Sequence, residues 1–276
     1  MLFTLFIKSF SKFAINTLWV CKSMMKITVI QQNIVWKDVE ANLKEMGRLI
    51  AKAEKADIYL FPEMCSTGFC MEPLGVAEPL DGPTVNKFRE WAKKYDAAIA
   101  GTVMTHEGGS VYRNRMYFVT PDGEVKHYDK CHLFEYSGED KVYTPGEQSV
   151  VWEWRGVRVR PVICYDIRFP IFLHNTGEYD VMLIAANFPE KRMLAWDTLV
   201  RARAIENQCY VAASNRVGAD DYGTYVGHSV IINPYGQTIA RCRSRYQGSA
   251  TAELEWSMME RLRRNFPVLH KDKKLQ

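Results

Sequence analysis

The stretch MKITVIQQNIVWKDVEANLKEMGRLIAKAEKADIYLFPE, residues 25–63, contains the pattern that decides the fold class. A short apolar run at 27–31 predicts a strand, apolar residues at helical spacing follow from 39 to 53, and a second apolar run covers 58–61. A strand, a helix and a second strand in this order form a β-α-β unit. Such a unit favours an α/β protein over an all-helical or all-β one.

Beyond residue 63 the pattern alternates between helices and hairpins. It predicts a helix after D-G-P at 81–83, strands at 97–103, 181–186 and 210–214, and a helix at about 192–207. Three hairpins are predicted, with turns at P-D-G 121–123, R-G 155–156 and N-P-Y-G 233–236. Some of these strands are linked through helices and others are paired in hairpins. This combination predicts an α/β (α+β) domain built on mixed sheets with layered helices.

The composition excludes several classes of protein. With 47% hydrophobic residues and a net charge of +4, from 36 Lys and Arg against 32 Asp and Glu, the chain can bury a core and shows no nucleic-acid footprint. Its seven cysteines lack C-x-x-C spacing, which argues against a disulfide framework and against a zinc site. Unpaired thiols fit a reducing compartment. We therefore expect a cytoplasmic protein with no metal and no nucleic-acid or membrane partner.

Residues 1–24 differ from the rest of the chain. Lys8, Lys12 and Lys22 interrupt their apolar run, and no small-residue cleavage site follows, so neither a membrane span nor a secretory signal is predicted. We expect an unstructured or peripheral extension, or an artefact of the assigned start, ahead of the strand that begins at Met25. Residues 25–276 contain no linker, repeat or low-complexity stretch, which predicts a single domain.

Chemically competent residues follow two of the predicted strands. Glu63 comes after an apolar strand and a proline, at a strand end where ligands gather in open α/β sheets, although a surface turn could also place a glutamate there. Lys130 follows the second strand of a hairpin and is either a fixed charge or a solvated lysine. Cys131 and His132 could form a thiol–imidazole pair or pack as structural residues. Taken singly, each of these residues leaves both interpretations open.

A third strand end carries a cysteine. The apolar strand at 157–163 delivers Cys164 to its end, and the residues that follow can start a turn or helix whose backbone N–H groups would face an oxyanion. The other cysteines lie in apolar runs or lack a comparable strand end: Cys21, Cys65, Cys70, Cys131, Cys209 and Cys242. Cys164 is therefore the predicted nucleophile among the seven.

Three segments together carry a family resemblance. F-P-E at 61–63, Y-D-K at 128–130 with H-L-F at 132–134, and I-C-Y-D-I-R-F-P at 163–170 resemble the nitrilase (carbon-nitrogen hydrolase) superfamily and its Glu-Lys-Cys triad. The likeness continues through A-N-F-P at 186–189, R-A-R-A-I-E-N at 201–207 and S-N-R-V-G at 214–218, and covers residues 25–265. In detail the chain is most similar to the omega-amidase branch, whose members hydrolyse the terminal amide of 2-oxoglutaramate and related short dicarboxylic monoamides.

The resemblance implies a four-layer α-β-β-α sandwich of two mixed sheets, and a reaction that needs no cofactor. Glu63 would take the proton of the Cys164 thiol as it attacks the amide carbonyl, and would pass it to the departing ammonia. Lys130 would lower the pKa of the thiol and, with the backbone N–H of Tyr165, hold the oxyanion. Water activated by Glu63 would then release the acid from the resulting thioester.

The resemblance also implies supporting residues. Glu139 matches a second glutamate of the family, expected to orient Lys130 and help seat the substrate, although it could be one more acidic loop residue. Phe188 stands where many relatives carry tryptophan, and should form an aromatic wall of the substrate pocket. Arg168 is the nearest cation for a substrate carboxylate, unless it pairs with Glu206. Further candidates for substrate binding, which the sequence does not rank, are the Tyr165 side chain, Arg192 and Arg216.

The resemblance also implies an oligomeric state, and other functions remain compatible with the same residues. Relatives usually dimerise through helices that follow the nucleophile and through the C-terminal segment, so a homodimer or larger homo-oligomer acting on a small-molecule amide is expected. Another branch, such as an N-carbamoyl hydrolase, a nitrilase or an acyltransferase, would use the same three residues. A catalytically silent scaffold would keep the fold without the reaction. A cysteine protease or redox sensor would use Cys131 and His132 in place of Cys164.

Overall fold

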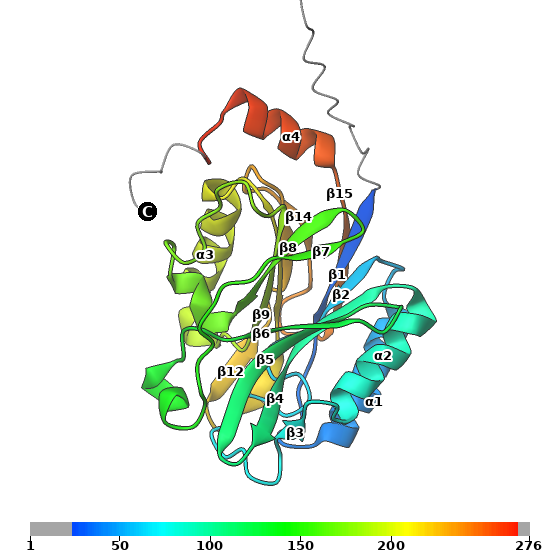
Figure 1. Ribbon diagram of the computed structural model, residues 1–276, viewed down its shortest axis with the longest axis vertical. Coiled ribbons are helices and arrows are strands. Elements are labelled where there is room, and N and C mark those ends of the chain that lie inside the picture. Colours follow the sequence, from blue (N-terminus) through cyan, green and yellow to red (C-terminus); the bar gives the residue numbers. More distant parts are fainter. Residues whose placement is uncertain (1–23, 270–276) are drawn as a thin grey trace, which may run out of the picture.

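The computed structural model describes residues 24–269 and contains two mixed β-sheets (Figure 1). The first sheet has the order β15-β1-β2-β4-β5-β6, with β3 paired to β4. Its strands are β1 Met25–Gln31, β2 Ile58–Leu60, β3 Glu78–Pro79, β4 Ala98–Gly108, β5 Val111–Val119, β6 Val125–Asp129 and β15 Gly248–Leu254. Strand β2 runs parallel to β1 and β4, whereas β5, β6 and β15 are antiparallel to their neighbours.

The second sheet has the order β14-β13-β10-β9-β8-β7. Its strands are β7 Trp152–Trp154, β8 Val157–Ile163, β9 Val181–Ala186, β10 Tyr210–Asn215, β13 Val230–Ile232 and β14 Thr238–Arg241. Strands β8, β9 and β10 are parallel, and the outer pairs are antiparallel. A separate hairpin joins β11 Val217–Asp220 to β12 Gly223–Val226. The three hairpins predicted from the sequence are confirmed by the pairs β5–β6, β7–β8 and β13–β14.

Helices cover both outer faces of the sheets. The α-helices are α1 Val39–Lys52, α2 Pro83–Tyr95, α3 Met193–Glu206 and α4 Trp256–Asn265, and short 3-10 turns are η1 Glu135–Ser137, η2 Glu139–Lys141, η3 Cys164–Arg168 and η4 Glu190–Arg192. Asp38 caps α1 by accepting a hydrogen bond from the Ala41 N–H, and Pro83 occupies the first turn of α2, where its missing N–H costs nothing. The longest described helices have 14 residues, and none in the described part of the chain has the length and apolar character to cross a membrane.

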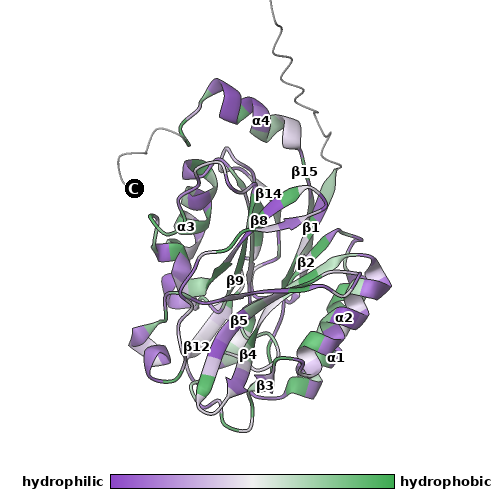
Figure 2. Ribbon diagram, in the orientation of Figure 1, coloured by the Kyte–Doolittle hydropathy of each residue, from purple (hydrophilic) through white to green (hydrophobic). Residues whose placement is uncertain are grey.

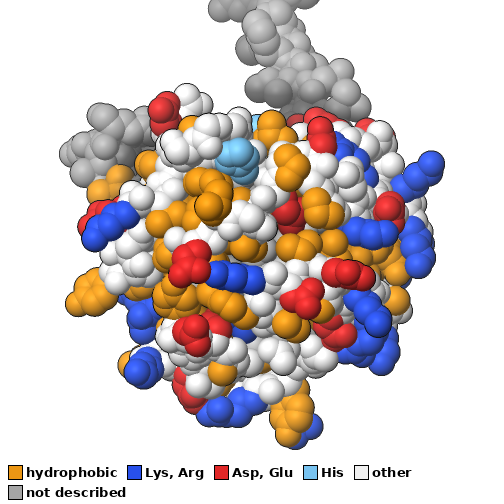
Figure 3. Space-filling view, turned by 90° about the horizontal axis from the view of Figure 1, so that it is seen from below, with side chains coloured by type: hydrophobic (Ala, Val, Ile, Leu, Met, Phe, Trp, Pro, Cys, Tyr) orange, Lys and Arg blue, Asp and Glu red, His pale blue; other side chains and the backbone are white. Residues whose placement is uncertain are grey.

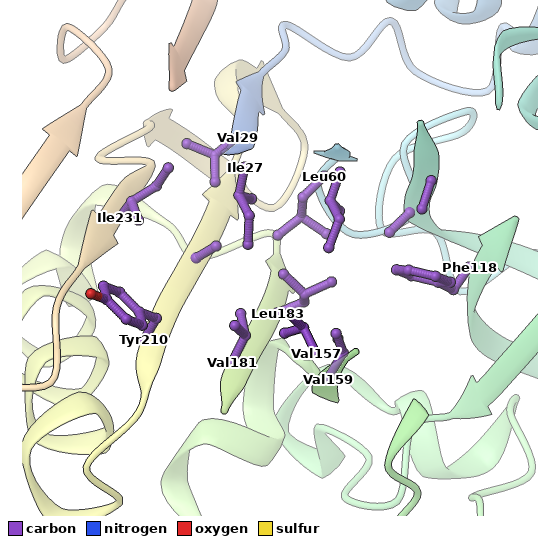
Figure 4. Close-up of a cluster of buried hydrophobic side chains, with 14 of the residues drawn as sticks. Ile27, Val29, Leu60, Phe118, Val157, Val159, Val181, Leu183, Tyr210 and Ile231 are labelled. Atoms are coloured by element: carbon purple, nitrogen blue, oxygen red, sulfur yellow. The ribbon is translucent and has the colours of Figure 1, made fainter. Parts of the chain in front are cut away.

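Three apolar layers hold the helices and sheets together. The inner faces of the two sheets meet in a cluster that includes Ile27 and Leu60 from one sheet and Val159 and Leu183 from the other (Figure 4). A second cluster joins α1 and α2 to the first sheet, and a third joins α3 to the second sheet. Figure 1 shows these helices on opposite flanks, and Figure 2 shows polar and apolar residues side by side along α1 and α2, as expected of helices with one buried face. The expected four-layer α-β-β-α sandwich is confirmed.

The N-terminal residues and three strands differ from the rest in how the sequence predictions apply to them. The expectation for residues 1–24 falls outside the described residues except for Met24, which is exposed. The strands β11, β12 and β15 were not predicted, because their sequences are rich in small and polar residues. Strand β15 pairs with β1 along its whole length, so the C-terminal part of the chain completes the sheet that the N-terminal strand begins.

Replacing Leu183 by Ala tests the contact between the sheets. Leu183 is fully buried in the central cluster, so the cavity left by the smaller side chain should lower the free energy of unfolding by about 2–5 kcal/mol in urea titrations. Leu74→Ala is the matched control, because Leu74 is 86% exposed and its loss should change stability by less than about 0.5 kcal/mol. Equal effects of the two substitutions would contradict the assignment of the core.

Candidate active site

One pocket of about 700 Å³ collects residues that follow strands of both sheets. Glu63 lies three residues beyond the end of β2 and Lys130 directly follows β6, both in the first sheet. Cys164 directly follows β8 in the second sheet and begins η3. All three residues line the pocket. The structure therefore brings together the three residues that the sequence singled out, from stretches more than thirty positions apart.

Lys130 is the centre of a buried ionic cluster. Its Nζ lies 2.9 Å from Glu63 Oε1, and 3.0 and 2.9 Å from the two carboxylate oxygens of Glu139. The lysine side chain is 1% exposed and both carboxylates are fully buried. The Phe69 ring, with its centroid 5.2 Å from the ammonium, covers the lysine on another side. Glu139 thus contacts Lys130 as the resemblance implied.

The charges of this cluster stabilise one another. Burial alone would lower the pKa of Lys130, but the negative charges of Glu139 and Glu63 outweigh it and raise the pKa well above its usual value. The pKa of Glu139 is raised, because burial and the nearby charge of Glu63 together outweigh the attraction of Lys130. Lys130 therefore stays protonated at any physiological pH and acts as a fixed positive charge.

Each oxygen of the Glu63 carboxylate has its own set of donors. Oε1 accepts hydrogen bonds from Lys130 Nζ at 2.9 Å and from Asn114 Nδ2 at 2.8 Å. Oε2 accepts the backbone N–H of Asn187 at 2.9 Å. The Asn187 side chain also donates to the main-chain carbonyl of Glu63, at 2.9 Å. The carboxylate is therefore fixed in orientation, with one oxygen more heavily hydrogen-bonded than the other.

Cys164 is held in an uncommon backbone conformation beside this carboxylate. Its φ of 44° lies in the left-handed region, which non-glycine residues rarely adopt and which costs on the order of 1–3 kcal/mol. Cys164, Glu63 and Asn187 all line the pocket. Tyr165 occupies the second position of η3, where a backbone N–H has no acceptor within the helix and is free to bind an oxyanion.

The pKa of the Cys164 thiol reflects opposing effects. Lys130 lowers it, as expected, but burial and the negative charge of Glu63 have larger effects in the opposite direction, so the pKa lies well above the usual value of a thiol. The expected effect of Lys130 on the thiol is therefore confirmed, but burial and Glu63 outweigh it. A thiol that is protonated at rest needs a neighbouring base before it can attack, and Glu63 lines the same pocket.

Asp166 ties the loop after β6 to the turn that carries Cys164. Its carboxylate accepts hydrogen bonds from the Tyr128 hydroxyl at 2.8 Å, from the His132 N–H at 2.9 Å and from the Ile163 N–H at 3.1 Å. The His132 ring also contacts Asp166 through Nδ1 and stacks on Phe169 with 3.7 Å between the ring centroids. One buried carboxylate thus sets the position of Lys130 relative to Cys164.

These contacts disfavour the thiol–imidazole alternative. His132 is a packed residue whose Nδ1 is already engaged by Asp166. The Cys131 thiol contacts the backbone carbonyl of Asp129 and packs against the central core, and neither Cys131 nor His132 lines the pocket. The structure therefore does not bring these two residues together as a nucleophile and its base.

Two buried arginines have structural partners. Arg203 of α3 donates from Nε and Nη2 to the backbone carbonyl of Ile167, at 2.8 and 2.6 Å, and so fixes η3 from behind. Glu206, which the sequence allowed as a partner of Arg168, pairs with Arg203 instead. Arg216, named as a substrate-binding candidate, is fully buried in an ion pair with Asp220 and does not line the pocket.

The mouth of the pocket carries cations and aromatic rings. Arg168 and Arg192 are exposed pocket residues, and their guanidinium groups lie 5.6 and 5.7 Å from the ring centroid of Phe188. Arg192 also lies 4.9 Å from the centroid of Phe134. No carboxylate pairs with either arginine in the described part of the chain, whereas Glu190 at the same rim pairs with Arg245. Phe188 forms a wall of the pocket, as expected.

Sequence reasoning missed four polar residues of this site: Asn114, Asp166, Asn187 and Arg203. Three of them lie in segments that carried the family resemblance, so their presence was noted without a role. Asn114 lies outside those segments. The sequence offers little to single it out, because it is one amide among the residues of a predicted strand. In the described residues no group of three or more His, Cys, Asp or Glu side chains is arranged to hold a metal ion.

Comparisons with known proteins agree on the family. The sequence model of the family described as Carbon-nitrogen hydrolase matches residues 26–264. The chain is 41% identical to omega-amidase YafV of Yersinia enterocolitica over 250 residues, which cover 90% of this chain and 96% of that protein. It is 35% identical to the 2-oxoglutaramate amidase of Bacillus subtilis over 248 residues, with coverages of 88% and 95%. A solved CN-hydrolase superfamily protein from Xanthomonas campestris, 36% identical, has a TM-score of 0.85, with 89% and 96% of the chains covered.

Replacing Lys130 by Met tests the buried ionic cluster. The substitution leaves two buried carboxylates without a counter-charge, so the free energy of unfolding at about pH 7 should fall by about 3–5 kcal/mol. Protonation of either carboxylate relieves that penalty, so the native variant binds protons more readily than its unfolded chain. The loss relative to the original protein should therefore shrink as the pH falls to about 5, and urea unfolding at both pH values measures it.

Lys126→Met is the control for this experiment. Lys126 lies on β6, in the same hairpin, but pairs with the exposed Glu124, so its loss should cost less than about 1 kcal/mol. A Lys130 variant with the same loss at both pH values would contradict the proposed charge balance.

Proposed function

The chain belongs to the carbon-nitrogen hydrolase family and is a hydrolase of carbon–nitrogen bonds; we propose that it is an omega-amidase, which converts the terminal amide of a small carboxylate-bearing substrate such as 2-oxoglutaramate to the acid and ammonia. The observation that carries the proposal is the single pocket in which Cys164 lies with Glu63, whose carboxylate a buried lysine holds in place. The names of its relatives support the choice of substrate class.

Acylation of Cys164 begins with a proton transfer. As the sulfur attacks the amide carbonyl, the thiol proton passes to Glu63, and negative charge develops on the carbonyl oxygen. All three Nζ hydrogens of Lys130 are directed at carboxylate oxygens in the resting site. Once Glu63 is protonated, its hold on Lys130 weakens, and the ammonium can turn to the oxyanion together with the Tyr165 N–H. Positive charge thus becomes available at the moment the oxyanion forms.

Collapse of the tetrahedral intermediate completes the first half-reaction. The carbon–nitrogen bond breaks, the leaving nitrogen takes the proton from Glu63, and ammonia departs, leaving a thioester on Cys164. Water then attacks the thioester while Glu63 accepts its proton. The carbon–sulfur bond breaks, the sulfur regains a proton from Glu63, and the acid is released. Glu63 serves as base and acid in both halves, and Glu139 keeps Lys130 charged and in position throughout.

The cations at the pocket mouth support a carboxylate-bearing substrate. Arg168 and Arg192 have no carboxylate partner among the described residues and lie beside the same aromatic wall. Arginine binds carboxylates in a forked geometry, and a hydrogen bond to a charged group is worth about 1.5–3 kcal/mol. We propose that these two residues hold the free carboxylate of the substrate while its amide reaches Cys164. The amide and the carboxylate must then lie at opposite ends of a short chain.

A substrate panel tests this proposal. Succinamate and 2-oxoglutaramate should be hydrolysed with a kcat/KM at least about a hundredfold above that of butyramide, which has the same chain length as succinamate but no carboxylate. Arg168→Met and Arg192→Met should each lower kcat/KM for succinamate by about 10- to 100-fold and leave butyramide unchanged. Lys87→Met, which removes an exposed charge of α2 outside the pocket, is the matched control.

Adding a simple nitrile and an N-carbamoyl amino acid to the panel separates the alternatives. Turnover confined to a nitrile or an N-carbamoyl amino acid would keep the family and discard the omega-amidase proposal. Ammonia release from succinamate that persists in Cys164→Ala would remove the proposed nucleophile. Absence of any turnover would favour a silent scaffold.

We also propose that the protein forms a homodimer in the cytoplasm. The six described cysteines are all free, which suits a reducing compartment. Figure 3 shows acidic and basic side chains interspersed on one face, with no broad patch of one sign to attract a nucleic acid. Ile171, after η3, and Leu194 of α3 are 82% and 85% exposed, so a second copy that covered them would remove apolar surface from water.

Light scattering tests the assembly. We expect the mass of a dimer for the original chain and a shift towards the monomer in Leu194→Glu, because a charge in an apolar interface is costly to desolvate. Leu74→Glu, at another highly exposed leucine, is the control. A monomer at micromolar concentration in the original chain would contradict the proposal.

A further inference from the structure

Asn114 is buried in the ionic cluster but takes no part in the proton transfers of the proposed reaction. The residue lies on β5 with 1% of its surface exposed. Its side-chain Nδ2 donates to Glu63 Oε1 at 2.8 Å and to Glu139 Oε1 at 3.1 Å. Its backbone carbonyl accepts the Lys130 N–H at 3.0 Å. Asn114 is thus joined to all three charged residues of the cluster.

The orientation of the Asn114 amide follows from its neighbours. Both atoms that face it are carboxylate oxygens, which can only accept hydrogen bonds when ionised, so the amide nitrogen must point towards them. The Asn114 Oδ1 atom is buried and has no hydrogen-bond partner in the described structure. A buried acceptor without a partner is costly, and this orientation is retained because the two donated hydrogen bonds outweigh that cost.

The two oxygens of Glu63 then differ in availability. Oε1 is occupied by Lys130 and Asn114, whereas Oε2 receives only the Asn187 N–H. Glu63, Cys164 and Asn187 line one pocket, and the Asn187 backbone, whose N–H donates to Oε2, also lowers the pKa of the Cys164 thiol, which places the thiol on the side of Oε2. Oε2 is therefore the oxygen with room to accept the thiol proton.

We propose that Asn114 is a positioning residue for the base: its amide holds Glu63 with Oε2 towards the thiol, and keeps that orientation when Lys130 turns to the oxyanion. This inference rests on the proposed function, in which Glu63 is the base of a cysteine hydrolase. During acylation Lys130 loosens its contact with Glu63, and Asn114 is then the remaining donor to Oε1. Without it the carboxyl group could rotate, and its proton would no longer be directed at the leaving nitrogen.

Asn114 also influences the charge state of the cluster. As a neutral double donor it stabilises the ionised forms of two carboxylates that share one ammonium, without adding a charge of its own. The other ionisable groups that act on these carboxylates are Lys130, Cys164, Tyr143 and Tyr225. The tyrosines are neutral at physiological pH because burial raises their pKa values, so they do not replace the lost donor. Loss of the amide should therefore make the active, ionised form harder to reach in acid.

The test is the pH dependence of kcat/KM in Asn114→Leu, a substitution of similar size without donors. The substrate is whichever amide of the panel the original enzyme hydrolyses fastest, so the test does not depend on the exact substrate. We expect kcat to fall by about 10- to 100-fold, KM to change by less than about threefold, and the acid limb of the profile to move up by about half to one pH unit.

Two further variants keep the result interpretable. Asn114→Ser is smaller and has a single O–H donor, so it cannot serve both carboxylates and should shift the acid limb in the same direction, which covers the case that the leucine variant does not fold. Asn233→Ala removes another buried amide, one that stabilises the β13–β14 turn by donating to Gln237. It should lower stability without moving the acid limb.

The outcomes are distinct. A folded Asn114→Leu or Asn114→Ser with the original kcat and acid limb would overturn the role of Asn114, while the proposed function would stand if Cys164→Ala and Glu63→Gln are inactive. If Glu63→Gln keeps full activity, the proposed base and this inference fail together. A lower melting temperature with an unchanged profile, as expected for Asn233→Ala, would also count against the proposal.

Discussion

A buried lysine between two buried carboxylates is the interaction on which the rest of the site depends. Removing such ions from water costs several kcal/mol each, and only close contact with satisfied hydrogen bonds recovers that cost. Lys130 meets Glu63 and Glu139 at 2.9–3.0 Å, so the segments that carry them must meet in one arrangement. We propose that the cluster in return supplies the Cys164 thiol with a base, Glu63, and with a fixed cation, Lys130.

The sandwich brings Glu63, the proposed base, to Cys164, the proposed nucleophile. Glu63 follows a strand of one sheet and Cys164 follows a strand of the other, and the apolar layer between the sheets sets their separation. Hydrogen bonds fix that separation further. Asp166 links the segment that carries Lys130 to η3, which begins with Cys164, and Arg203 of α3 donates to the backbone of η3. The strained backbone of Cys164 is retained because these contacts surround it.

Much of this could be predicted from the sequence, for identifiable reasons. The hairpins have recognisable turn residues, and the triad residues stand at strand ends that apolar runs define. The order of layers came only from the resemblance, because a strand buried on both faces reads as a continuous apolar run that does not say which neighbour covers it. Strand β15, G-S-A-T-A-E-L, is too polar to be recognised without its partner β1. Lys130 lowers the pKa of the thiol as predicted, but burial, which is not visible in a sequence, outweighs that charge and raises the pKa overall.

We propose that an acyl group passes through the sulfur of Cys164, and stopping the reaction during turnover tests this step. Acid quenching within the first turnovers on succinamate, followed by mass spectrometry of the digested protein, should show the mass of a succinyl group on the peptide that contains Cys164, and this adduct should disappear as the substrate is used up. A protein that turns over succinamate without any adduct on that peptide, or with the adduct on Cys131, would contradict the account.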